Sequence, residues 1–439
     1  MNEVFSRLRH FYESRWHIFI LLLLSVCATV LDLEHYIIPV FVLWIVFILV
    51  THENFTDILL PILLLNAMAI RTIGQGTYHE KHLWLAIPAA LGILLHFILF
   101  PRKLTVGKTF YPLCAVSVAL LLGGVGVIGR EEYFNVSSLY FVFFLGVGMV
   151  GFYLWMRSHM LSSESYDVKE RFLEILYVFG IFCAFSILEQ SLRLYIGYGE
   201  VVPFSWCNDI CEMLLFAIPV PFYFARRRFY HFFVPFLFYA AMLPAMSLTA
   251  VAVGAVLLLL GTVYTAVCNR EKRLFAYLTL ALLLCAMVLA GYRFDLFGLD
   301  KIAAFFEDQE NGRTLLFKKA WENFLSHPLF GVGMGAGNTG ESVLNGFWTH
   351  NYFLQILGSM GMLGALAYGY QLFVRVRLAL AHPSALRLIV FLSYLGIFLA
   401  SMLQPGEFCP MPYELLAVGL FVILERDDAP ENPRVSFDN

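Results

Sequence analysis

Residues 36–50 read Tyr-Ile-Ile-Pro-Val-Phe-Val-Leu-Trp-Ile-Val-Phe-Ile-Leu-Val and contain no charged side chain. Such a run predicts a membrane-crossing helix, because about 20 mainly apolar residues span the hydrocarbon core. Helices are expected because lipid offers no hydrogen-bond partners to unpaired backbone groups. The sequence shows no alternation of apolar and polar residues of the kind that a membrane barrel requires. Several similar runs are shorter than about 20 residues, so their helices must include flanking residues to cross the membrane. Fourteen runs lie near residues 17–31, 36–50, 58–70, 83–100, 111–128, 137–156, 172–192, 213–225, 232–246, 250–267, 274–290, 351–373, 388–403 and 413–424.

The composition of the whole chain agrees with a membrane protein. Of the 439 residues, 60% are hydrophobic and 14% are charged, and the mean hydropathy is +0.75. A soluble domain is about half apolar and about a quarter charged. The sequence therefore predicts an all-α, polytopic transmembrane bundle of about 14 spans, with a long outward loop that carries amphipathic helices.

Basic residues give the expected orientation, because they favour cytoplasmic loops. With both termini inside, 20 of the 29 Lys and Arg residues fall on the cytoplasmic side and 9 outside. We therefore expect both termini to be cytoplasmic. The basic groups on the inner side are Arg7, Arg9 and Arg15; Arg102, Lys103 and Lys108; Arg157, Lys169 and Arg171; Arg226, Arg227 and Arg228; Arg270, Lys272 and Arg273; Arg375, Arg377 and Arg387; and, in the C-terminal tail, Arg426 and Arg434.

One connection between the predicted spans is much longer than the others. Residues 1–291 contain predicted helices 1 to 11, and residues 351–424 contain helices 12 to 14, followed by a cytoplasmic tail over 425–439. Residues 292–350 between them form an extracytoplasmic loop rich in aromatic residues and Gly. Long loops inside compact proteins tend to be functional or disordered, and this composition favours a functional loop.

Residues 311–326 of this loop predict an amphipathic helix lying along the outer membrane surface. Arg313 is the exception in its pattern, since it falls in the first turn on the apolar side. Such an arginine needs an anionic partner. The alternatives are that it reaches lipid headgroups or pairs with Asp308 or Glu310. The apolar face consists of Leu316, Phe317, Ala320, Trp321, Phe324 and Leu325.

Glycines follow this helix in two patterns. Alternate residues from Gly331 to Gly337 are glycine, which predicts a turn-rich connection whose backbone N–H groups could form a nest for phosphate oxygens. Gly358, Gly361 and Gly364 recur at intervals of three in the next apolar run. That spacing indicates close helix packing rather than chemistry.

His350 stands where the loop meets the next predicted span. The N-terminal dipole of that helix would lower the imidazole pKa and keep the ring neutral, and a neutral imidazole can accept a proton. The alternative is a merely solvated interfacial histidine, which is the more common case for a lone histidine.

Several other arginines lie at or near outward helix ends. Glu189 and Arg193 are four residues apart on one helix face and are expected to pair. Arg71, Arg130 and Arg293 are either headgroup anchors or, together, a surface that attracts a diphosphate. Arginine suits that task through its planar fork of donors.

The long loop and the helix after it contain a series of motifs in a fixed order, interrupted by short stretches without a pattern. The motifs are Asn311-Gly312-Arg313, Trp321, His327-Pro328-Leu329-Phe330-Gly331-Val332-Gly333, His350-Asn351-Tyr352-Phe353-Leu354-Gln355-Ile356-Leu357-Gly358, Gly361 and Gly364.

The order, spacing and placement of these motifs resemble the O-antigen ligase and O-antigen polymerase family, over roughly residues 250–424. The resemblance implies a bacterial multi-span enzyme that moves a glycan from undecaprenyl diphosphate onto an acceptor hydroxyl, at the outer face of the inner membrane. It assigns Arg313 to the family's loop arginine and His350 to its loop histidine. Arg313 would stabilise the leaving diphosphate, and His350 would be the general base.

The chain departs from the family in one place. A Ser-Arg pair is usual where a span begins after a short outer turn, and here the sequence is Met246-Ser247-Leu248-Thr249-Ala250. Arg293 or Arg193 is the candidate substitute as a ligand of the donor diphosphate. The fourteen predicted spans also exceed the dozen that is typical of the family.

The expected partners are the lipid-linked donor, a lipid or glycan acceptor, and membrane lipids, with no nucleic acid. No acidic metal cluster stands out in the loop, so we expect neither a metal nor a cofactor. A polysaccharide polymerase of the O-antigen or capsule type is the alternative, because it shares donor, site and topology. A transporter or lipid flippase is the alternative of another class; the prolines in the runs would allow its broken helices, but charges at mid-span are nearly absent.

Overall fold

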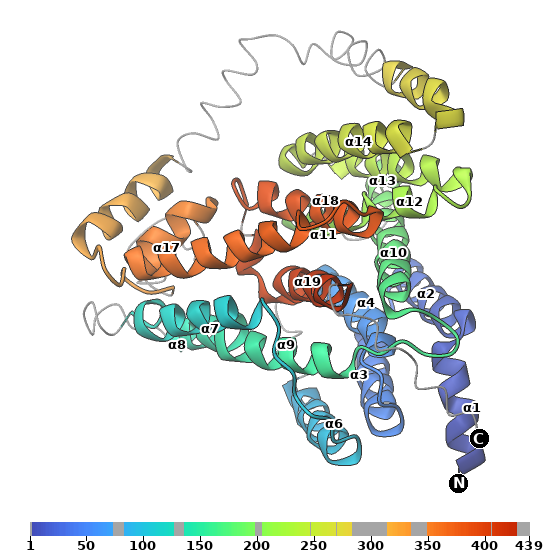
Figure 1. The fold of residues 1–439 in the computed structure, drawn as a ribbon, viewed down its shortest axis with the longest axis horizontal. Coiled ribbons are helices and arrows are strands. Elements are labelled where there is room, and N and C mark those ends of the chain that lie inside the picture. Colours follow the sequence, from blue (N-terminus) through green and yellow to red (C-terminus); the bar gives the residue numbers. More distant parts are fainter. Residues whose placement is uncertain are drawn as a thin grey trace.

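The computed structural model describes residues 2–72, 83–126, 136–197, 204–245, 247–268, 270–282, 314–334, 349–404 and 406–427. These residues form helices and their connections, and none of them lies in a strand (Figure 1). The prediction of an all-α chain is confirmed, and every one of the fourteen predicted runs overlaps a helix.

The first half of the chain forms a series of helices joined mainly by short turns. Their bounds are α1 Asn2–Glu13, α2 Arg15–Val30, α3 Glu34–Thr51, α4 Thr56–Thr72, η2 Leu83–Leu85, α6 Ala86–Leu99, α7 Phe110–Ala119, η3 Leu120–Gly124, α8 Val136–Phe141, η5 Val142–Val147, α9 Gly148–His159, α10 Val168–Ile196 and α11 Phe204–Ala217.

The second half has shorter elements and more breaks. Pro219 lies between α11 and the helix after it, and Pro221 lies in the first turn of that helix, where the missing backbone donor is tolerated. The bounds are α12 Val220–Phe224, η6 Phe229–Phe233, α13 Val234–Met242, η7 Leu243–Ala245, α14 Leu248–Cys268, η8 Arg270–Lys272, Arg273–Leu282, a helix over 314–326, α17 Tyr352–Ala379, α18 Ala385–Ala400, η10 Gly406–Phe408, η11 Pro410–Glu414 and α19 Leu415–Asp427.

Four helices of the described chain are long and apolar enough to cross a membrane: Glu34–Thr51, Ser138–His159, Val168–Ile196 and Thr249–Cys268. The bent pair of Ser6–Glu13 and Arg15–Val30, with 66° between its helices, would bring the number to five. The remaining apolar helices are shorter. The chain is therefore a helical membrane protein, and the number of fourteen spans stays a prediction.

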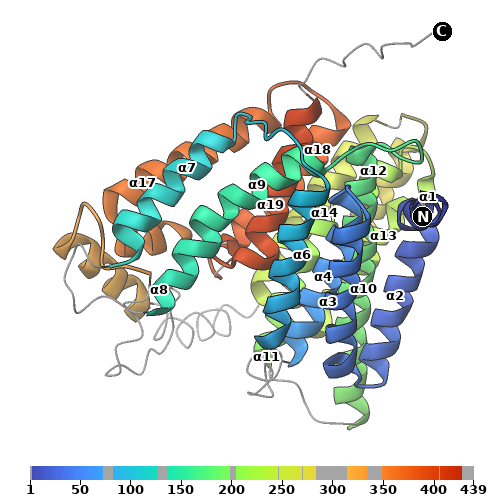
Figure 2. The ribbon, with the colours of Figure 1, turned by 90° about the horizontal axis from the view of Figure 1, so that it is seen from below.

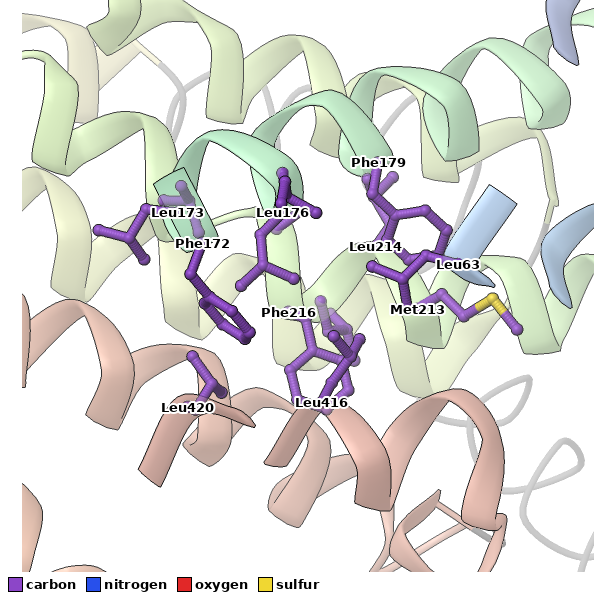
Figure 3. Packing of buried hydrophobic residues seen from close by; sticks show 14 of the residues in the cluster. Leu63, Phe172, Leu173, Leu176, Phe179, Met213, Leu214, Phe216, Leu416 and Leu420 are labelled. Carbon is purple, nitrogen blue, oxygen red and sulfur yellow. The ribbon is translucent and has the colours of Figure 1, made fainter. Parts of the chain in front are cut away.

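The hydrophobic core lies where α10, α11 and α19 meet. In Figure 3, Leu176 of α10 points toward Phe216 of α11 and Leu416 of α19, Phe172 points toward Leu420 of α19, and Phe179 lies beside Leu214 of α11. All of these side chains are buried. In Figure 2, α2, α3, α4, α6 and α10 run roughly side by side, whereas α7, α9 and α17 are inclined to them. The inclined helices build a second, smaller apolar cluster that includes Leu120, Tyr352 and Met360.

Loops that were predicted on one side of the membrane contact one another. At the predicted inner side, Glu425 accepts a hydrogen bond from Arg157 Nη1 at 2.5 Å, and Lys169 pairs with Asp427 at 3.0 Å. At the predicted outer side, Arg71 pairs with Glu34 at 3.0 Å and with Glu189 at 2.7 Å. The contacts agree with the predicted alternation of loops; the orientation of that alternation in the membrane stays a prediction.

The helix α17 folds back on itself at Gly361, whose φ of 62° and ψ of −154° are not helical. The rings of Tyr352 and Tyr368 lie 6.0 Å apart, although a straight helix would separate these residues by about 24 Å along its axis. The expectation of one uninterrupted span over 351–373 is therefore wrong. Glycine permits the turn because it has no Cβ, and the result is two legs, 352–360 and 362–379.

Candidate functional site

The site predicted around His350 lies at the N-terminus of the first leg of α17. Asn351 is the N-cap residue, and its side chain accepts a hydrogen bond from Leu354 N at 3.1 Å. The same side chain donates to Met402 O at 3.4 Å. The cap ends the loop at His350, so the predicted start of this helix is confirmed.

The backbone of His350 has a φ of 54°, which is uncommon for a residue other than glycine. Its side chain is half-buried. Such a conformation persists only where the surroundings hold it, and it is frequent at functional sites. Thr349 N donates to Gln355 Oε1 at 2.7 Å, so the residue before His350 is tied back to the helix.

Gln355 anchors this arrangement inside the first leg. It is buried, and its Nε2 donates to Ser359 Oγ at 3.1 Å and lies 3.9 Å from Met334 Sδ. A buried amide that finds partners on both sides rigidifies its neighbours. The side chain thus joins the stretch before α17, the leg itself and the glycine-rich segment.

The glycine-rich segment pairs with the break in α17 through its backbone. Val332 N donates to Gly358 O at 3.0 Å, and Gly333 N donates to Ser359 O at 2.9 Å. In return, Met362 N donates to Pro328 O at 2.8 Å. Backbone groups released at a helix break must find new partners in an apolar environment, and this segment supplies them.

The same hydrogen bonds rule out a free phosphate nest over Gly331–Met334. Gly331 N donates to His327 O at 2.8 Å, and Met334 N donates to Gly124 O at 2.7 Å. The described N–H groups of the segment are therefore engaged inside the protein. Residues 335–348, which include Gly335 and Gly337, lie outside the described residues.

Glycine is required in this segment by the closeness of the neighbouring backbone. A Cβ on Gly331 would lie 2.6 Å from Ser359 O, and one on Gly333 would lie 2.7 Å from Gly126 Cα. A Cβ on Gly361 would lie 2.6 Å from Leu329 C. All three glycines have positive φ. The predicted close packing is confirmed for Gly361, whereas for Gly331 and Gly333 the sequence predicted only a turn-rich connection.

The described part of the amphipathic helix, 314–326, packs on the same place. A Cβ on Gly358 would lie 3.0 Å from Ala320 O, and Ala320 is buried. Trp321 and Leu325 of the predicted apolar face are 47% and 62% exposed. The predicted apolar face of this helix therefore packs on the protein at Ala320, whereas Trp321 and Leu325 at its edge point away from the protein.

The structure shows the surroundings of two of the four predicted site residues, His350 and Arg193. Arg313 and Arg293 lie outside the described residues, as do Arg130, Asp308 and Glu310. Arg193 pairs with Glu189, as predicted, and it donates to both carboxylate oxygens of Asp32 at 2.8 and 2.7 Å. Its Nη2 donates to Thr29 O and Val30 O. A diphosphate would have to displace these acceptors, and the role of Arg193 at the donor stays a prediction.

Sequence reasoning missed a buried ionic cluster close to this site. Arg375 was assigned to the inner side, and Glu407 lies between the predicted runs 388–403 and 413–424, on the opposite side in the predicted alternation. Yet Arg375 Nη1 lies 3.4 Å from Glu407 Oε1. Arg375 Nη2 also lies 2.5 Å from Glu414 Oε1. The statement that charges are nearly absent at mid-span is therefore wrong here. The signal was present in Glu414, which falls inside the apolar run 413–424.

Comparison with known proteins finds one family model that matches part of the chain. Residues 235–369 match the model of a family described as O-antigen ligase. No curated protein and no solved structure matches the chain. The matched region runs from α13 to the second leg of α17 and includes Arg313, the glycine-rich segment and His350. It confirms the resemblance seen in the motifs, and together with the apolar helices it indicates a membrane enzyme of the bacterial inner membrane. The match over these residues supports membership of the chain in the O-antigen ligase and polymerase family.

Proposed function

We propose that the protein transfers a glycan from undecaprenyl diphosphate to an acceptor hydroxyl, as an O-antigen ligase does, at the outer face of the cytoplasmic membrane. The observation that carries the proposal is the family match over residues 235–369. Within that match, His350 sits at a capped helix N-terminus beside the glycine-rich segment. A histidine held on a rigid support in this way supports the proposal that His350 accepts a proton.

The donor's diphosphate is the group that needs charge stabilisation. When the bond between the anomeric carbon and the phosphate oxygen breaks, negative charge develops on the departing lipid diphosphate. Arg313 supplies a planar fork of donors for that charge. Arg293 and Arg193 are the further proposed ligands, and the pairing of Arg193 with Asp32 and Glu189 counts against a close contact.

The acceptor hydroxyl must lose a proton as it attacks. His350 takes that proton as general base, while the hydroxyl oxygen forms its bond to the anomeric carbon. The diphosphate leaves from the opposite face, and direct displacement of this kind inverts the anomeric centre. One bond forms, one breaks, and the proton passes to the imidazole.

The first test is His350→Ala. Loss of a general base slows the chemical step by roughly 10²–10⁴-fold, so the variant should insert at parental levels and fail to transfer glycan in purified membranes. His382→Ala is the matched control, because His382 is an exposed histidine in the α17–α18 connection. Transfer at the parental rate by His350→Ala would show that His350 is structural.

Ligase and polymerase activities are separated by the product that accumulates without the enzyme. Deletion in the host, followed by gel analysis of surface glycans, should leave an unattached polymer if the protein is a ligase. Single repeat units on the acceptor would instead identify a polymerase. Normal surface glycans would argue against both and favour a transporter or flippase of another substrate.

A further inference from the structure

Arg375 is the centre of a polar cluster inside the helical bundle. It is 2% exposed, and it contacts Glu407, Glu414 and the Tyr394 hydroxyl, the last at 3.4 Å. Gln371 Nε2 donates to Glu414 Oε1 at 3.1 Å. Charges buried at membrane depth are expensive to keep and usually mark functional places.

The depth of the cluster follows from the lengths of the helices around it. Arg387, near the start of α18, lies 3.8 Å from Asp427 at the end of α19, so both helices meet at one face. The 16 residues of α18 and the 13 of α19 extend about 24 Å and about 20 Å. Both lengths are shorter than a hydrocarbon core of about 30 Å. The 401–414 connection therefore lies within membrane depth.

Irregular backbone is tolerated there only where protein covers it or where it lines a water-filled cavity. The connection packs against the leg that carries His350: Asn351 Nδ2 donates to Met402 O at 3.4 Å, and the Tyr352 ring lies 5.3 Å from the Phe408 ring. Glu407 lies between these contacts in sequence, and its N–H donates to Ser401 Oγ at 3.1 Å.

The two carboxylates have different surroundings. Glu414 lies closer to Arg375 and also accepts a hydrogen bond from Gln371, so its carboxylate can neutralise the charge of the arginine by itself. Glu407 Oε1 lies 3.4 Å from Arg375 Nη1, and the neighbouring Phe408 packs against the Tyr352 ring of the first leg. Neutralising Arg375 does not require Glu407, and its place in the connection suggests another role.

We propose that Glu407 is a positioning residue of the transfer site. Held by Arg375, it fixes the 401–414 connection against Asn351 and Tyr352, and it thereby holds the backbone that places His350. The proposal rests on the proposed function of His350. Glu407 itself touches neither donor nor acceptor in this role; it acts through the first leg of α17.

The experiment compares Glu407→Gln with Glu414→Gln in the full-length purified protein. Each variant removes one carboxylate from the same arginine at constant side-chain volume, so both should lower the unfolding temperature. A small displacement of a reacting group costs about 100-fold in rate. We therefore expect kcat to fall about 100-fold in Glu407→Gln alone, with the KM for the lipid-linked donor unchanged. Equal kcat values for the two variants, whether both parental or both reduced, would overturn the proposal.

Ser401→Ala provides a second measurement in case Glu407→Gln does not fold. It removes the acceptor of Glu407 N without changing a charge, and kcat should fall while the KM for the donor stays constant. A parental kcat would contradict the positioning role. His350→Ala separates the two proposals: transfer by that variant refutes the function of His350, whereas its inactivity beside a fully active Glu407→Gln refutes only the role of Glu407.

Discussion

Two regions of the molecule are held together by different means. At the predicted inner face, Glu425 of α19 contacts the start of α7 and α9 through its side chain: it accepts from Thr109 N at 2.6 Å, Tyr153 Oη at 2.8 Å and Arg157 Nη1 at 2.5 Å. At the candidate site, the glycine-rich segment, η3 and α17 are joined backbone to backbone, as in the bond from Met334 N to Gly124 O.

The difference shows where each region tolerates change. The contacts of Glu425 depend on one carboxylate, and loss of that charge lowers the free energy of unfolding without changing the geometry of distant segments. A backbone contact depends on the absence of Cβ atoms, so any side chain shifts the chain itself. The contact between the glycine-rich segment and α17 therefore uses no charged group, and in the proposed mechanism the charge for the diphosphate comes from the arginine of the preceding loop.

Arg313 tests that last point with the largest expected effect. Arg313→Lys keeps the charge but loses the planar fork, and removal of a charge-stabilising donor costs roughly 10²–10³-fold in rate. We expect glycan transfer to fall by that factor in purified membranes, with normal insertion. Full glycan assembly by Arg313→Ala at normal expression would contradict the assignment.

Gly331→Ala breaks the backbone contact itself. With a φ of 68° and Ser359 O only 2.6 Å from an added Cβ, the segment must move away from α17, and misplacement of a reacting group costs about 100-fold in rate. Measured transfer per inserted protein should fall by about that amount. The control is Gly369→Ala in the second leg of α17, where an added Cβ meets nothing within 4 Å. Equal activities of the two variants would show that the contact does not position the site.

Glu425→Gln should affect stability alone. Removing one partner of a buried ion pair costs about 3 kcal/mol, so the unfolding temperature in detergent should drop while kcat of the folded protein stays parental. The control, Glu53→Gln, removes an ion pair with Arg102 in which both side chains are more than a third exposed, and such pairs contribute at most about 1 kcal/mol. A fall in kcat for Glu425→Gln would show that the contacts of Glu425 affect the candidate site, which would contradict the independence of the two regions.

Hydropathy located the helices because each apolar run must be buried in lipid or protein wherever it packs. Every predicted run overlaps a helix, and the pair of Glu189 and Arg193 follows from their spacing on one helix face. The start of α17 at Tyr352 was also predictable, since Asn351 caps it through a local hydrogen bond. These features depend on neighbours within a few residues along the chain.

The arrangement of the site depends on contacts between distant segments. The motif residues pointed to His350, but the fold-back at Gly361 requires the carbonyl and N–H groups of residues 328–333 to replace the broken helical bonds. The pairing of Arg375 with Glu407 depends on the shortness of α18 and α19, which brings residues expected on opposite faces to one depth. Local periodicity carries no information on such pairings, because their free energy comes from segments that meet only after the bundle has packed.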